Sequence, residues 1–273
     1  MASNVPLSVV ILTKNESERI RDCIDSARWA DEILVVDDES TDDTVRLAES
    51  LGARTLRRKM EVEGAHRNWA YAQARHEWIL SLDADERVTP ELAQEIRTLI
   101  QDGSPYETYA IPRRNYIGKR WVRYGGWYPS AQLKLFKRSV FRWEETSVHP
   151  RAIGPAWGVL RSDLLHFSYR DLNDFAQKLD RQTTLEAKKW VADRRTMTMS
   201  KALWRTIDRV ARTYVVKQGY REGRLGCFVA WMAGKYQWMS YVKYLQMKRA
   251  GQPAAVAAET ASPTGKAPSK EAS

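Results

Sequence analysis

The sequence predicts an α/β protein in which a mostly parallel sheet carries helices on both faces and a helical C-terminal region follows. The prediction rests on short apolar segments that alternate with segments of helical spacing over the first hundred residues. The apolar segments are residues 7–12, 32–37, 53–57 and 77–83. Each is too short for a typical helix, and a continuously apolar strand is buried on both faces. Strands of this kind, separated by helices, indicate βαβ units and a parallel sheet.

Two helices are predicted between the first three strands. Residues 17–29 repeat apolar side chains at helical spacing. The repeated residues are Ile20, Cys23, Ile24 and Ala27. Residues 42–52 follow a run of Ser, Thr and Asp that can cap a helix, and they end at Gly52, which favours helix termination.

The pattern changes after about residue 105, where Pro and Gly interrupt the chain. Residues 132–138 have the character of an antiparallel strand or hairpin, and helical spacing returns over residues 171–192 and 199–248. The tail after Arg249 is rich in Ala, Pro and Ser and has no aromatic residue, so we expect it to be disordered.

These patterns divide the chain into three parts. We expect residues 1–160 to form the α/β domain, residues 161–249 to form a basic, aromatic-rich helical region, and residues 250–273 to form the tail. With 273 residues and 43% hydrophobic content, the chain can bury a sizeable core.

Composition limits the cellular setting and the partners. A membrane-spanning helix needs about 18 or more consecutive apolar residues, and we find neither such a run nor a signal peptide, so we expect a cytoplasmic protein. The net charge is +10, and residues 161–250, with 19 Lys and Arg against 8 Asp and Glu, carry the whole excess. Positive charge attracts nucleic acid, anionic lipid and phosphorylated molecules alike. We expect no nucleic-acid partner, because the basic residues form no recognised binding motif.

Polar and acidic residues follow three of the predicted strands. They are Thr13, Asn15 and Glu16 after the first, Asp37 and Asp38 at the end of the second, and Asp83, Asp85 and Glu86 at the end of the fourth. The carboxyl ends of strands in an open parallel sheet are where ligands bind. The sequence therefore predicts a site at this edge.

Asp83 and Asp85 form an Asp-x-Asp pair at the end of a buried strand. Two carboxylates in this position can share a hard divalent cation, Mg²⁺ or Mn²⁺, whose remaining ligands are water and phosphate oxygens. The alternative is a solvated turn, in which Glu86 and Glu91 complement the dipole of the helix that follows.

Four segments, in this order and spacing, resemble the nucleotide-binding half of the family 2 glycosyltransferases of GT-A fold. They are "SVVILTKNE", "VVDDESTDDT", "GAHRNWA" and "WILSLDADE", and they cover about residues 7–100. Further on, four segments resemble the bacterial lipopolysaccharide core subgroup, typified by the inner-core β-1,4-glucosyltransferase. They are "YPSAQLKLFKR", "SVHP", "LLHFSYRDLNDFAQKLDRQTTLEA" and "GYREGRLGCFVAWMAGKYQWMSYVKYLQ". The resemblance implies that residues 1–160 are the catalytic domain that binds the nucleotide sugar and that residues 161–249 serve acceptor or membrane contact. The resemblance extends over nearly the whole folded chain.

The resemblance implies a UDP-sugar donor and a set of contacts to it. The implied nucleotide-sugar contacts are Thr13, Asn15, Glu16, Asp37, Asp38, Arg67 and Asp83. Asp37 or Asp38 would accept a hydrogen bond from uracil or ribose, and Asp83 and Asp85 would carry the metal and the diphosphate. Asp38 could instead order the helix-capping loop, and Arg67 could instead form a surface ion pair.

The resemblance implies an inverting transfer, in which the acceptor hydroxyl attacks the sugar directly. Such a transfer needs a general base near the acceptor hydroxyl. The subgroup often has a Glu directly after the Val-His pair, and here that position is Pro150. We expect Glu145 to be the base, with Glu144 as the alternative and His149 contacting or orienting the acceptor. If none of them serves, the protein would bind a nucleotide sugar without transferring it.

The resemblance also implies a glucosyl donor and a lipopolysaccharide-core or other lipid-linked glycan acceptor. The predicted last helix intersperses basic residues with apolar and aromatic ones: Phe228, Trp231, Met232, Trp238, Tyr241 and Leu245. Such a helix can lie in the interface of an anionic inner membrane, or it can pack on the sheet domain. We expect His166 to be a packed or loop-ordering histidine.

Overall fold

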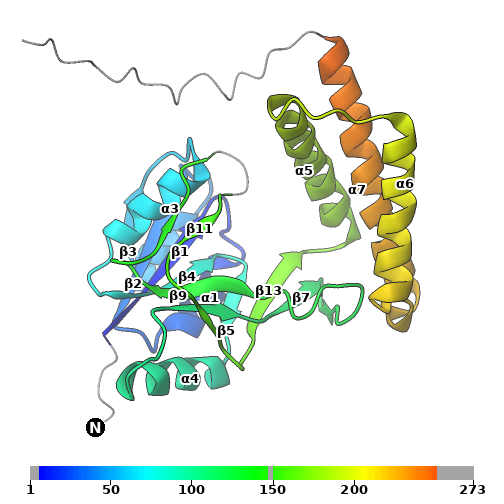
Figure 1. The fold of residues 1–273 in the computed structure, drawn as a ribbon. Coiled ribbons are helices and arrows are strands. Elements are labelled where there is room, and N and C mark those ends of the chain that lie inside the picture. Colours follow the sequence, from blue (N-terminus) through cyan, green and yellow to red (C-terminus); the bar gives the residue numbers. More distant parts are fainter. Residues whose placement is uncertain (1–5, 147–149, 251–273) are drawn as a thin grey trace, which may run out of the picture.

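The computed structural model describes residues 6–146 and 150–250. Its largest sheet has seven strands in the order β12-β6-β9-β4-β1-β2-β3 (Figure 1). The strands are β1 (Leu7–Thr13), β2 (Glu32–Asp37), β3 (Arg54–Arg57), β4 (Trp78–Asp83), β6 (Thr108–Ile111), β9 (Gln132–Lys137) and β12 (Gly158–Val159). Strands β1 to β4 pair in parallel, whereas β9 runs antiparallel to β4 and β6. The predicted mostly parallel sheet and the predicted antiparallel strand at residues 132–138 are confirmed.

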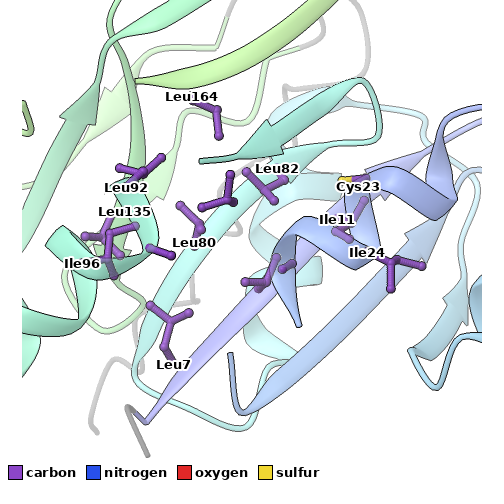
Figure 2. Close-up of a cluster of buried hydrophobic side chains, with 14 of the residues drawn as sticks. Leu7, Ile11, Cys23, Ile24, Leu80, Leu82, Leu92, Ile96, Leu135 and Leu164 are labelled. Atoms are coloured by element: carbon purple, nitrogen blue, oxygen red, sulfur yellow. The ribbon is translucent and has the colours of Figure 1, made fainter. Parts of the chain in front are cut away.

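Helices cover both faces of this sheet. Successive residues of a strand point to opposite faces, so neighbouring residues of β1 contact different helices. Val9 and Ile11 of β1 pack with α1 (Ile20–Ala27) and α4 (Pro90–Gln101), whereas Val10 packs with α3 (Glu63–Ala72). Figure 2 shows the first of these clusters, to which β9 also contributes Leu135. The helix α2 (Thr44–Ser50) lies between β2 and β3 in the chain, as predicted.

A second sheet of four strands, in the order β5-β13-β7-β8, lies beside the first. Its strands are β5 (Glu86–Val88), β7 (Arg113–Ile117), β8 (Arg120–Trp121) and β13 (Leu164–Tyr169). The pairing places His166 of β13 opposite Glu86 of β5. Although β13 follows residue 160 in the chain, it therefore returns to the acidic segment at the end of β4. A two-stranded ribbon of β10 (Arg142–Trp143) and β11 (Ala152–Ile153) completes the strands of the described chain.

The C-terminal region is helical, as predicted. It contains α5 (Leu172–Ala192), α6 (Met199–Ala211), the π-helical turn η1 (Arg212–Val216), the 3₁₀ turn η2 (Gly219–Glu222) and α7 (Arg224–Arg249). The predicted helical stretch over residues 199–248 is thus interrupted, because Gln218 and Gly223 have φ values of 55° and 63°. The turn is tight: a Cβ atom on Gly226 would lie 1.8 Å from the Gly219 carbonyl oxygen.

The last helix packs against its neighbours through much of its aromatic and apolar surface. Phe228 and Met232 join a cluster with α5, and Tyr241 and Leu245 join a second cluster with α5 and α6. By contrast, Trp231 is 55% exposed. Packing against α5 and α6 therefore covers most of the aromatic and apolar side chains singled out in this helix. Across residues 6–146 and 150–250, no helix is long and apolar enough to cross a membrane.

Candidate active site

The carboxyl ends of β1, β2 and β4 meet at one edge of the sheet. Thr13 lies in register with Asp37, and Leu12 lies in register with Asp83. The predicted convergence of three polar clusters is therefore present, and it follows from the parallel pairing of these strands.

Hydrogen bonds between backbone and side-chain atoms join the loop after β1 to the segment after β2. Asn15 has a φ of 54°, a conformation that Asn tolerates better than most residues. Its N–H donates to Ser40 Oγ over 2.7 Å, and its Oδ1 accepts from the Thr41 N–H over 2.8 Å. The Glu16 N–H donates to Thr44 Oγ1 over 2.8 Å. These bonds fix the entrance to the sheet edge between the two loops.

Asp38 is held by two donors at the same edge. Its carboxylate accepts from Lys14 Nζ over 2.8 Å and from the Met60 N–H over 2.7 Å. Burial alone would raise the pKa of Asp38, but these donors stabilise the carboxylate and hold its pKa below the ordinary value. Asp38 is therefore an ionised group that orders the 58–60 segment, in addition to any contact it makes with a ligand.

Two buried polar atoms beside it have no hydrogen-bond partner within the described residues. They are Asp37 Oδ1 and Thr13 Oγ1. The other oxygen of Asp37 accepts from the Ser40 N–H over 2.8 Å, and Asp37 is fully buried. Buried polar atoms in native proteins are nearly always paired, so an acceptor left open at a ligand-binding edge fits a ligand with N–H or O–H donors.

Two cationic side chains neutralise Asp83. Lys134 Nζ lies 2.9 Å from Asp83 Oδ2, and Arg67 Nη2 lies 3.4 Å from Asp83 Oδ1. Burial would raise the pKa of Asp83, but these two charges outweigh it and hold the pKa well below the usual range. Arg67 is 18% exposed and reaches Asp83 at the sheet edge from α3, and its contact with phosphate or sugar stays a prediction.

Glu86 belongs to the same charge cluster. It is fully buried and pairs with Lys134 Nζ at 2.7 Å and Arg113 Nη1 at 3.4 Å. The interpretation of Glu86 as a complement to the helix dipole is wrong, because residues 86–88 form β5 and the helix begins later, at Pro90. Thr89 caps that helix, accepting from the Leu92 N–H over 3.1 Å.

Asp85 has a different environment from Asp83. Its Oδ2 lies 3.6 Å from His166 Nε2 and 3.8 Å from Arg19 Nη1, distances longer than a hydrogen bond. His166 Nδ1 lies 2.7 Å from Asn115 Oδ1. The β13–β5 pairing therefore brings the His166 ring to Asp85, a neighbour that the expectation of a packed or loop-ordering histidine did not include.

The pair of Asp85 and His166 suits one side of a divalent cation. When Nδ1 donates its proton to Asn115 Oδ1, Nε2 presents a lone pair toward Asp85, as in many metal-ligating histidines. In the described parts of the chain, no three His, Cys, Asp or Glu side chains gather closely enough to hold a metal ion by themselves. Mg²⁺ and Mn²⁺ bound with nucleotides typically take few protein ligands and complete their shell with phosphate and water, so the pair fits such an ion.

The candidate base segment lies along α3. Asn68 Nδ2 donates to the Trp143 carbonyl over 2.9 Å and lies 3.4 Å from Glu145 Oε1. The Glu144 carbonyl oxygen approaches Gly64 so closely that a Cβ atom there would be 1.9 Å away. His149 lies outside the described residues. The structure thus places Glu144 and Glu145 beside the helix that carries Arg67.

A cavity of about 330 Å³ opens between this segment and the charge cluster. Its walls include Arg67, Lys134, Trp143 and Pro150. The cavity therefore connects the cations that neutralise Asp83 with the segment that follows Trp143.

The sequence that forms this sheet edge matches the model of a known protein family. The model of glycosyl transferase family 2 matches residues 8–164, more than half of the chain. The chain therefore belongs to glycosyltransferase family 2. The predicted sheet with helices on both faces and a helical C-terminal region is confirmed.

Individual relatives differ in how much they share. The lipopolysaccharide core biosynthesis glycosyltransferase LpsC of Rhizobium meliloti is 24% identical over 90% of this chain and 94% of its own length. An uncharacterised glycosyltransferase of Rickettsia bellii is 41% identical over 38% of this chain, and the match spans 37% of that protein. Among solved structures, residues 1–349 of Staphylococcus aureus TarS with UDP-GlcNAc align with a TM-score of 0.47 and 14% identity, covering 90% of this chain and 92% of that one.

Proposed function

We propose that this protein is an inverting glycosyltransferase. It would move a hexose, expected to be glucose, from a UDP-sugar to a lipopolysaccharide-core or other lipid-linked glycan. The observation that carries the proposal is the sheet edge at which the strand ends that carry Thr13, Asp37 and Asp83 meet. Family membership supports the reaction class, and the full-length similarity to LpsC supports the acceptor class.

The nucleotide would lie across the ends of β1 and β2. Asp37 Oδ1, which is buried and has no hydrogen-bond partner in the described chain, would accept a hydrogen bond from uracil or ribose, while Asn15 and Glu16 keep the loop in place. Asp38 would add a second acceptor from the same loop.

The diphosphate would lie near Asp83 and Asp85. A bound Mg²⁺ or Mn²⁺ would neutralise charge on the departing diphosphate. Asp85 and His166 would hold this ion, while Asp83, whose oxygens already meet Lys134 and Arg67, would contribute its remaining lone pairs. Arg67 would add a positive charge on the sugar or phosphate side.

Calorimetric titration tests the proposal directly. The purified protein is titrated with UDP-glucose and a panel of other nucleotide sugars, with Mn²⁺ or Mg²⁺ and again with a chelator. We expect selective binding of one UDP-sugar that weakens when the chelator removes the cation. If none of the nucleotide sugars binds, the sheet edge serves another ligand and the family membership describes fold only.

Replacing Glu145 with Gln is expected to lower the transfer rate by about 10²–10⁴-fold, since the amide cannot accept the acceptor proton. Affinity for the UDP-sugar should stay unchanged, because Glu145 lies beside Asn68 of α3 and not on the β1–β2 edge. Glu144→Gln is the matched control. A loss confined to Glu144→Gln would transfer the role to that residue.

Two further outcomes of this assay matter. Unchanged turnover in both variants would place the base elsewhere. Tight donor binding by the wild-type chain without turnover on any lipid-linked acceptor would favour the alternative function, a nucleotide-sugar-binding relative that lacks a base. The residue that favours this alternative is Pro150, which stands where the resembling subgroup often has Glu.

A lipid-linked acceptor would be reached at a membrane. We therefore also propose that the protein acts in the cytoplasm, in peripheral contact with the anionic inner face of the cytoplasmic membrane. The positive excess of residues 161–250 supports this contact, because anionic lipid headgroups attract basic surfaces.

A further inference from the structure

The helix α6 exposes an apolar face. Of its 13 residues, Ala202 is the one that is buried. Met199, Leu203 and Ile207 are 63%, 50% and 60% exposed, and their four-residue spacing places them along one side of the helix. Trp204, beside Leu203, is 63% exposed. Large apolar side chains gathered in this way on a surface commonly mark an interaction site.

The exposed apolar residues continue into the turns after α6. Val215 and Val216 of η1 are 61% and 72% exposed, and the rings of Tyr214 and Tyr220 lie 6.3 Å apart. We call this surface the α6 face. It comprises Met199, Leu203, Trp204, Ile207, Tyr214, Val215, Val216 and Tyr220.

The chain itself covers a different side of α6. A Cβ atom on Gly234 of α7 would lie 2.5 Å from Val210 Cγ2 and 3.5 Å from Thr206 Cγ2, so α6 meets α7 through these residues. In Figure 1 the helix stands at the outer edge of the helical region, on the side away from the seven-stranded sheet. The α6 face is therefore accessible to a partner outside the chain.

The charge of the same segment indicates which partner fits. Residues 199–217 contain one acidic residue, Asp208, and five basic ones: Lys201, Arg205, Arg209, Arg212 and Lys217. Asp208 already pairs with Arg212 at 2.7 Å. A second copy of the chain would present the same excess of cations across a symmetric interface, which is unfavourable. An anionic lipid surface offers an apolar layer for the aromatic and aliphatic side chains and negative charge for the cations.

We propose that the α6 face is the surface through which this protein docks on an anionic lipid bilayer. The inference deepens the membrane contact in the proposed function by naming the segment that makes it. Apolar side chains of α6 and η1 would enter the interfacial region, and the surrounding Lys and Arg side chains would lie among the headgroups. This assigns the contact to α6 and not to α7, whose aromatic residues are mostly packed.

Vesicle co-sedimentation of the full chain tests the proposal. The probes are vesicles of phosphatidylcholine with phosphatidylglycerol and vesicles of phosphatidylcholine alone. We expect binding to the anionic vesicles, and the double variant Trp204→Glu/Ile207→Glu should lower the partition coefficient by more than about tenfold. Lys201→Gln should lower it by about fivefold, the effect of one basic residue at an anionic surface.

The matched control carries the same charge change on the sheet domain. Trp157 and Val159 are 57% and 61% exposed, so Trp157→Glu/Val159→Glu should leave vesicle binding within about twofold of wild type. Equal vesicle binding by the two double variants would overturn the proposal. So would self-association of the wild-type protein that Trp204→Glu/Ile207→Glu abolishes in sedimentation velocity, because the face would then bind a second copy.

Nucleotide binding on the same samples separates this inference from the proposed function. Wild-type protein that binds a UDP-sugar but no anionic vesicle would overturn docking and leave the transferase proposal intact. Vesicle binding that depends on Trp204 and Ile207, in a protein that binds no nucleotide sugar, would support docking and contradict the transferase proposal.

Discussion

Replacing Lys134 with Met is expected to lower the free energy of unfolding by about 3–5 kcal/mol, the usual cost of removing one partner from a buried ion pair. The Lys134 side chain is 4% exposed and lies between Asp83 and the fully buried Glu86. Met fills a similar volume but carries no charge. Glu86 would keep Arg113, at 3.4 Å, as a cationic partner, but the two carboxylates would lose the cation that lies between them and their repulsion would rise.

The control is the same substitution three residues further along β9. Lys137 is 33% exposed and pairs with Glu107, itself 43% exposed, at 3.0 Å, and a surface pair of this kind is worth about 0–1 kcal/mol. Urea denaturation followed by far-UV circular dichroism gives both values. Equal losses for Lys134→Met and Lys137→Met would show that the buried cluster is not held together by the Lys134 charge.

The pH dependence of stability provides a second readout of the same cluster. The pKa of Asp83 in the folded protein lies below its unfolded value of about 3.9, so the ionised carboxylate stabilises the fold. This contribution is complete above the unfolded pKa and is lost as the pH falls toward the folded pKa. Lys134→Met should reduce this acid-side loss, because the folded pKa of Asp83 would rise toward the unfolded one. The measurement is the unfolding free energy between about pH 7 and pH 3 for both proteins.

The parallel half of the fold could be predicted because it is local in sequence. Strands β1, β2 and β4 are continuous apolar runs that end in polar residues, and parallel pairing makes those ends neighbours. The predicted helices are longer than the observed ones by a few residues at each end. For example, the predicted helix covers residues 17–29, whereas α1 spans Ile20–Ala27. Helix ends depend on caps and tertiary contacts more than on the apolar repeat.

The partners of the acidic edge could not be predicted because they arrive from distant antiparallel strands. Lys134 comes from β9 and His166 from β13, and a shift of one residue in either register would turn these side chains to the other face. One signal was present: Lys134 lies inside the strand "QLKLFK", where a basic residue among apolar neighbours indicates a buried charge that needs a partner. The location of its partner depends on the register of β9 against β4.

Replacing Asp85 with Ala is expected to abolish the metal-dependent part of UDP binding without unfolding the protein. The side chains nearest the Asp85 carboxylate, His166 and Arg19, lie at 3.6 and 3.8 Å, too far for strong pairs. Its removal should therefore change the free energy of unfolding by less than about 1 kcal/mol. Loss of the Asp85 carboxylate as a donor, however, should lower the apparent Mn²⁺ affinity by at least about a hundredfold. Calorimetric titration with UDP, with Mn²⁺ and with chelator, measures the difference directly.

Three comparison variants make this result specific. His166→Gln should lower the apparent Mn²⁺ affinity in the same direction, by about 10–100-fold, because it removes the second donor. Asp25→Ala, which removes an exposed carboxylate paired with Arg28, should leave binding unchanged. Asp83→Ala should also destabilise the fold by leaving Lys134 with one carboxylate fewer, so it separates stability from metal binding less cleanly. Full metal-dependent affinity in Asp85→Ala would show that the cation is held without Asp85 and would overturn its assignment as a metal ligand. UDP binding by the wild-type protein that does not change with chelator would instead leave Lys134 and Arg67 as the cations that meet the diphosphate.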